Sequence, residues 1–79
     1  MDFLKKRIRK FQEKKLDEIL SKIQFYQYMI KQAEHNRLDE ITPDETIKIR
    51  EEISYNEKMM EIWQKNEEKL RRQMREMED

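Results

Sequence analysis

The sequence predicts an all-α fold, an antiparallel two-helix coiled-coil hairpin that forms a single domain over residues 1–79. Charged residues make up 46% of the chain, glycine is absent and proline occurs once, and the apolar residues recur with a helical period. Sheets and tight turns depend on glycine, so its absence favours long helices. A chain this small encloses only a thin core, and its stability is expected to be marginal unless it binds a partner or dimerises into a four-helix bundle.

The turn between the helices is predicted from one strong helix-start signal. Thr42 can act as the N-cap, Pro43 suits the first helical position, and Glu45 stands three residues after the cap, as in a capping box. The first helix is therefore expected to span about residues 2–37 and the second about 43–78. Two helices of similar length with a short connection pack side by side in opposite directions.

Each predicted helix carries an apolar stripe that could form the seam between them. The stripe of the second helix alternates spacings of four and three, as in a coiled-coil heptad, and consists of Ile49, Ile53, Asn56, Met60, Trp63, Glu67, Leu70, Met74 and Met77. The stripe of the first helix is looser, and consists of Leu4, Ile8, Phe11, Lys15, Ile19, Ile23, Tyr26, Ile30 and Ala33.

The two stripes match when facing residues have numbers that add up to between 81 and 83. Leu4 then faces Met77, and the polar interruptions coincide as two pairs, Lys15 with Glu67 and Tyr26 with Asn56. We expect such polar pairs to define the register more than they stabilise the fold.

A second set of apolar residues lies outside this seam, and consists of Phe25, Tyr28, Met29, Tyr55, Met59 and Ile62. The predicted register places Phe25 beside Met59 and Met29 beside Tyr55. Exposed patches of aromatic residues and methionine are typical of protein interfaces, and the alternative is that these side chains thicken a thin core. The patch favours a small interaction or regulatory protein whose partner is a second copy or a larger protein.

The charges are distributed unevenly, although the chain is neutral overall. Residues 1–15 and 65–79 hold twelve basic and seven acidic residues, and residues 16–64 hold six basic and eleven acidic residues. The basic residues at the open end that could contact nucleic acid or an acidic partner are Lys5, Lys6, Arg7, Arg9, Lys10, Lys14, Lys69, Arg71, Arg72 and Arg75. The alternative function is thus a nucleic-acid-associated accessory protein, of a phage or mobile-element type, although no nucleic-acid-binding motif accompanies these residues.

Catalytic and membrane functions receive little support from the residues. The chain has no cysteine, its one histidine is His35, and Ser21 and Ser54 are isolated, so we expect no enzyme activity, metal or cofactor. The longest uncharged run, residues 23–30, is too short to cross a bilayer, and a cytoplasmic protein is expected. The N-terminal apolar residues could lie on an anionic membrane, but their use in the seam is the more economical interpretation.

Overall fold

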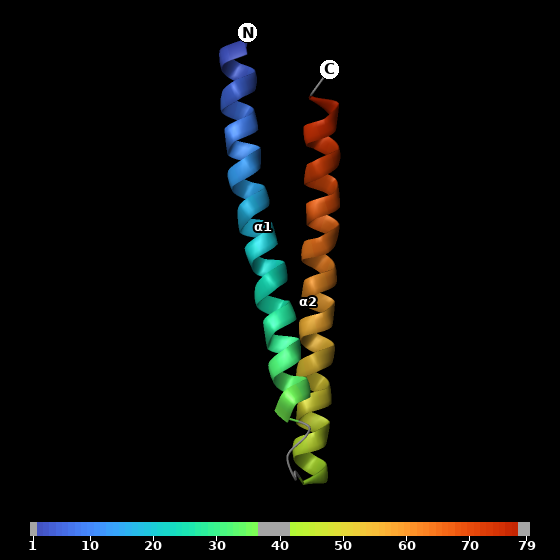
Figure 1. Cartoon of the computed structure of the whole chain (residues 1–79). Helices are drawn as coiled ribbons and strands as arrows, with labels where there is room; N and C mark the ends of the chain where they lie inside the picture. The colour runs from blue at the N-terminus through green and yellow to red at the C-terminus, as the bar shows by residue number, and fades with distance from the viewer. Residues whose placement is uncertain (1, 37–41, 78–79) are drawn as a thin grey trace.

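Two long helices lie side by side in opposite directions in the computed structural model, which describes residues 2–36 and 42–77 (Figure 1). Helix α1 spans Asp2–Asn36 and helix α2 spans Pro43–Glu76. The Cα atoms extend over 62 × 14 × 12 Å, so the molecule is a narrow rod. The predicted all-α hairpin is confirmed. The second helix ends at Glu76 rather than near residue 78. The predicted end of the first helix, residue 37, lies outside the described residues.

The start of α2 has the predicted capping box. The Thr42 hydroxyl accepts a hydrogen bond from the Glu45 backbone N–H at 3.2 Å, and the Glu45 carboxylate accepts one from the Thr42 N–H at 3.4 Å. Pro43 occupies the first turn, where its missing N–H costs no hydrogen bond. These contacts satisfy donors that a helix start otherwise leaves to water, and a cap of this kind contributes about 1 kcal/mol.

The interface stripe of α2 is the predicted one. All nine predicted seam residues are buried or half-buried, and the most deeply buried are Ile53, Asn56 and Leu70. The strict alternation of four and three keeps one face of a long helix turned toward its partner over the whole length.

The predicted stripe of α1 is confirmed from Ile19 to Ala33 and is wrong toward the N-terminus, where Leu4, Ile8, Phe11 and Lys15 are exposed. The half-buried residues in this part of α1 are instead Gln12 and Leu16. The observed stripe alternates four and three without a break, and consists of Gln12, Leu16, Ile19, Ile23, Tyr26, Ile30 and Ala33. The predicted stripe contained three consecutive steps of four, from Phe11 through Lys15 and Ile19 to Ile23, and such a run moves a stripe gradually around the helix to another face.

The register between the helices also differs from the predicted one. The Gln12 amide N–H donates to the Met77 sulfur at 3.4 Å, and Leu70 shares a buried cluster with Ile19. Both pairs have numbers that add up to 89 rather than about 82, which displaces α2 by about two turns from the predicted pairing. Extending the same relation by heptads places Tyr26 near Trp63 and Ala33 near Asn56.

The predicted polar pairs are separated by this displacement. Lys15 is exposed, and the ion pair of Glu67 is formed within α2, where its carboxylate accepts from Arg71 at 2.7 Å. Asn56 is only 4% exposed, and the small residue Ala33 is 2% exposed. A side chain as small as that of Ala33 in the interface leaves room for a close approach of the two helices at this point.

Each helix extends past the end of the other. The N-terminal turns of α1 project beyond the end of α2, and the first turns of α2 project beyond the end of α1 (Figure 1). Near the end of α2, Met77 contacts Gln12 and shares a recess with Lys5, Lys6 and Arg9, so it lies beside the helix positions of these residues and not beside those of Leu4 and Ile8. This is why Leu4 and Ile8, which the sequence analysis paired with α2, remain exposed.

The core is a single thin layer. Ile19, Ile23 and Leu70 form its buried cluster, and the half-buried residues packed on it are Leu16, Met60, Trp63 and Met74. No described side chain is completely inaccessible. A core of this size offsets the conformational entropy of the chain only narrowly, so association with a partner would add substantially to stability.

The cap gives a first prediction. Thr42→Ala removes the acceptor for the Glu45 N–H and is expected to lower the free energy of unfolding by about 1 kcal/mol, and the melting temperature by about 4–8 °C. Thermal unfolding followed by circular dichroism measures the change. Ser54→Ala, at an exposed position within α2, is the control and should not destabilise. Equal melting temperatures for Thr42→Ala and the wild type would show that the cap contributes nothing.

The buried Asn56 gives a second prediction. Asn56→Leu replaces a buried amide by an apolar side chain of similar size, so we expect a higher melting temperature and a less uniform oligomeric state. Gln64→Leu, which changes an exposed position of the same helix, is the control. Unfolding and light scattering would test both effects, and a marked loss of stability confined to Asn56→Leu would contradict the prediction.

Candidate protein-interaction surface

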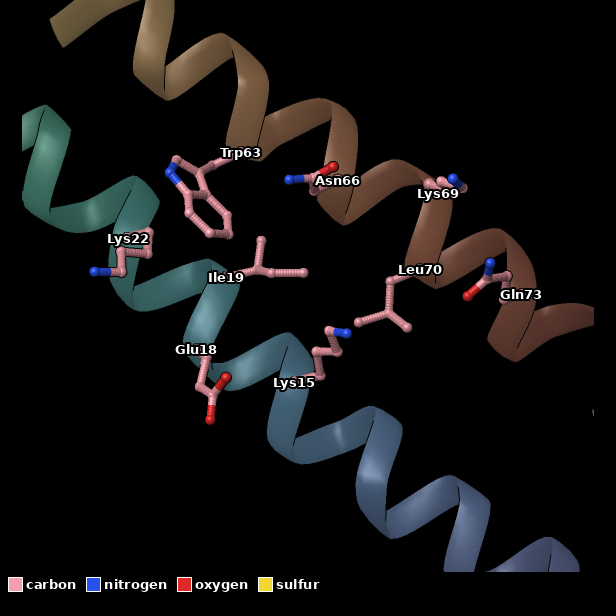
Figure 2. A pocket seen from close by; sticks show the side chains of 9 residues that line it. All are labelled: Lys15, Glu18, Ile19, Lys22, Trp63, Asn66, Lys69, Leu70 and Gln73. Carbon is pink, nitrogen blue, oxygen red and sulfur yellow. The ribbon is translucent and has the colours of Figure 1, made fainter.

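Beside the interface, one flank of the rod is formed by both helices together. An open groove of about 500 Å³ lies on this flank, with the interface residues Ile19, Trp63 and Leu70 in its floor. Its rims are polar and come from the two helices, with Lys15, Glu18 and Lys22 on α1 and Asn66, Lys69 and Gln73 on α2 (Figure 2). These six residues identify the helix positions that face this side.

The same helix positions recur every seven residues and extend the flank along the rod. On α1 they continue to Phe25 and Met29 in one direction and to Leu4, Ile8 and Phe11 in the other. On α2 they continue to Ile62, Met59 and Tyr55. We call this side the apolar flank, because most of its residues beyond the groove are apolar.

Five of the six predicted interface residues lie on the apolar flank. Phe25, Tyr55 and Ile62 are each more than half exposed, and Met29 and Met59 are half-buried. Lys22 and Asn66 lie on the two rims of the groove, and the residues one heptad further toward the loop are Met29 and Met59. The observed register therefore places Met29 nearer to Met59 than to Tyr55. The sixth predicted residue, Tyr28, is exposed on the outer side of α1. We refer to Phe25, Met29, Tyr55, Met59 and Ile62 as the central patch.

A second apolar stripe, which was not predicted from the sequence, lies on the same flank. Leu4, Ile8 and Phe11 are exposed near the N-terminus, Phe11 to 65%, although they had been assigned to the seam. The signal that could have identified them is the run of three consecutive steps of four from Phe11 to Ile23. We refer to Leu4, Ile8 and Phe11 as the terminal stripe.

Basic side chains lie over the exposed N-terminal rings. The Lys15 ammonium stands 5.7 Å from the centre of the Phe11 ring, and the Arg7 guanidinium stands 5.8 Å from that of Phe3. Each pair is four residues apart on α1. Cation–π contacts at exposed sites contribute about 0.5–1 kcal/mol, so they orient the rings but leave most of their area exposed.

The indole of Trp63 has a hydrogen-bonding group without a partner. Its Nε1–H is buried, and no acceptor among the described residues is within reach. Leaving a buried donor unsatisfied costs about 1–3 kcal/mol. This cost reduces further the small stability that the thin core provides.

The opposite flank differs in composition. Between residues 13 and 34 of α1 its single apolar residue is the half-buried Leu20, and its other positions are Glu13, Asp17, Gln24, Gln27, Lys31 and Glu34. On α2 the corresponding positions are Arg50, Ser54, Glu57, Glu61, Gln64, Glu68, Arg71 and Arg75. Two exposed apolar residues also occupy these opposite positions, Phe3 of α1 at 69% exposed and Ile47 of α2 at 54% exposed. Most of the exposed large apolar residues nevertheless lie on the apolar flank, namely Leu4, Ile8, Phe11, Phe25, Tyr55 and Ile62.

The ten predicted basic residues are all exposed but do not form one continuous patch. Lys5, Lys6 and Arg9 line a shallow recess of about 310 Å³ together with Gln12 and Met77. The others, Arg7, Lys10, Lys14, Lys69, Arg71, Arg72 and Arg75, are distributed around the two helices, and Arg71 is paired with Glu67. The structure thus brings together three of the ten at the open end.

Within residues 2–36 and 42–77, no group of three or more His, Cys, Asp or Glu side chains is placed to hold a metal ion. Over the same ranges, neither helix has a stretch long and apolar enough to cross a membrane. Comparison with protein-family models, with curated proteins and with solved structures finds no match.

Proposed function

We propose that this chain is a small non-enzymatic interaction protein of the cytoplasm, of an adaptor or regulatory kind, that binds a protein partner through its apolar flank. The observation that supports the proposal is that most of the exposed aromatic, aliphatic and methionine side chains lie on one side of the rod, whereas the other side is mostly polar. Exposed apolar surface that is gathered rather than scattered marks binding sites in soluble proteins.

The central patch has the composition of an interface core. Aromatic residues and methionine are enriched there, because large rings bury much area and methionine adapts to irregular surfaces. Burying one large apolar side chain contributes about 1.5–3 kcal/mol, and Phe25, Tyr55 and Ile62 are more than half exposed. Together they supply several kcal/mol toward the cost of association.

The first test changes the central patch. Phe25→Glu with Ile62→Glu should leave the helices intact, since both side chains are exposed, and should abolish partner binding by placing two carboxylates in the contact. Gln24→Glu with Gln64→Glu is the matched control, because it adds the same charge at neighbouring exposed positions outside the flank. Circular dichroism, light scattering and capture of partners from a lysate of the source organism are the measurements.

The outcomes separate the proposal from its rival. Loss of binding confined to the Phe25 and Ile62 variant supports it. Unfolding of this variant would instead show that these residues stabilise the thin core. Equal binding by wild type, variant and control would overturn the proposal.

A nucleic-acid-associated role at the open end is the second candidate, and the recess lined by Lys5, Lys6 and Arg9 favours it. Converging basic side chains neutralise phosphates and release counterions, which makes such binding strongly salt-dependent. The recess offers neither a stacking platform nor a helix placed to read bases, so any such contact would be made to the backbone.

A titration with duplex DNA tests this candidate. If it holds, affinity should fall roughly tenfold or more between about 50 and 200 mM salt, and should be lost when the recess residues Lys5, Lys6 and Arg9 are changed to Glu. Lys31, Lys48 and Lys58 changed to Glu make the matched control, with the same change in net charge away from the open end. Equal losses in both variants would indicate a net-charge effect and contradict a specific site.

A further inference from the structure

We infer that the partner of the apolar flank is a second copy of this chain, packed in the opposite direction, so that the terminal stripe of each copy covers the central patch of the other. The inference rests on the proposed function and names its partner. It assigns the exposed Leu4, Ile8 and Phe11 a role that the hairpin itself leaves open.

The flank of α1 is arranged almost symmetrically about Glu18. Phe11 and Phe25 each stand seven residues from Glu18, and Lys15 and Lys22 stand three and four residues from it. Further out, Ile8 and Met29 stand ten and eleven residues away. All seven positions face the same side of the helix, because they continue the rim of one groove by heptads.

This arrangement makes the flank complementary to itself under a two-fold rotation. An axis near Glu18, perpendicular to the rod, places Phe11 of one copy on Phe25 of the other and Ile8 on Met29. In an isologous contact of this kind the two copies contribute the same residues. Both terminal stripes of the dimer are therefore covered, one at each end. Met59 and Ile62 of α2 widen the surface that receives the stripe.

The charges favour this orientation independently of the apolar residues. The open half of the rod, residues 1–15 and 65–79, has a net charge of +5, and residues 16–64 have −5. This uneven charge gives each rod an electric dipole along its length, and two such dipoles attract each other when the rods approach in opposite directions and repel each other when they approach in parallel. At the centre, each Glu18 comes within one turn of Lys15 and Lys22 of the second copy.

The size of the flank is adequate for a stable dimer. A stable interface buries about 800 Å² on each partner, and a side of a rod that measures 62 × 14 × 12 Å between Cα atoms can supply that area. The result is a four-helix bundle. In the single hairpin no described side chain is completely inaccessible, and the bundle would double the thickness of this core. A lipid surface would accept the terminal stripe, but it would repel Glu18 and the acidic half.

Engineered cysteines test the orientation, because the natural sequence contains none. Glu18→Cys places a thiol near the two-fold axis, and mild oxidation should yield a covalent dimer in high proportion. Ser21→Cys is the matched control, since this exposed residue lies one turn away on the outer side of α1 and should be oxidised at least tenfold more slowly. A mixture of Ile8→Cys and Met29→Cys copies should form the mixed disulfide faster than either copy alone forms a homodimer.

Light scattering of the unmodified chain gives the second readout, with an expected mass of two chains. A single-chain mass at every concentration would overturn the dimer, as would equal cross-linking of Glu18→Cys and Ser21→Cys. A monomer whose binding to another protein is lost in the Phe25 and Ile62 variant would refute the second copy and retain the proposed function. A monomer that binds only anionic vesicles, through the terminal stripe, would overturn both.

Discussion

The packing of Ile19 and Ile23 of α1 against Leu70 of α2, in one particular register, is the constraint on which the rest of the structure depends. The cluster is small, and the half-buried Trp63 and Met74 complete it. Because few contacts fix the relative position of the helices, a displacement of one or two turns decides which other side chains are covered. The exposed surfaces are therefore consequences of where this cluster forms.

The overhang of the N-terminal turns of α1 is the first such consequence. At the observed register Met77, beyond the end of α2, lies against Gln12 and the basic residues of the recess, and Leu4, Ile8 and Phe11 remain exposed. A hairpin built for its own stability would align its ends and bury them. This one leaves a row of apolar side chains beside a groove whose rims are polar, a pattern suited to an interaction surface.

Apolar surface and charge vary along the rod in a coordinated manner. The terminal stripe belongs to the basic half of the molecule, and the central patch lies nearer the acidic half. Steering by opposite charges and burial of apolar area therefore favour the same relative orientation of two rods. Neither helix would have to refold for such a contact, so no ordering entropy is added to the cost of association.

The sequence by itself determined the two helices, the start of the second helix and the face that α2 buries. The capping box at Thr42 and the unbroken heptad of α2 are local features, and local hydrogen bonding and periodicity are enough to specify them. The central patch was also predictable, because Phe25 and Ile62 fall outside the heptad stripes. Only the tertiary structure decided the register and the division of the α1 apolar residues into two stripes. Several registers pair apolar with apolar almost equally well, and the choice depends on how Ala33, Asn56 and the rings of the core fit together.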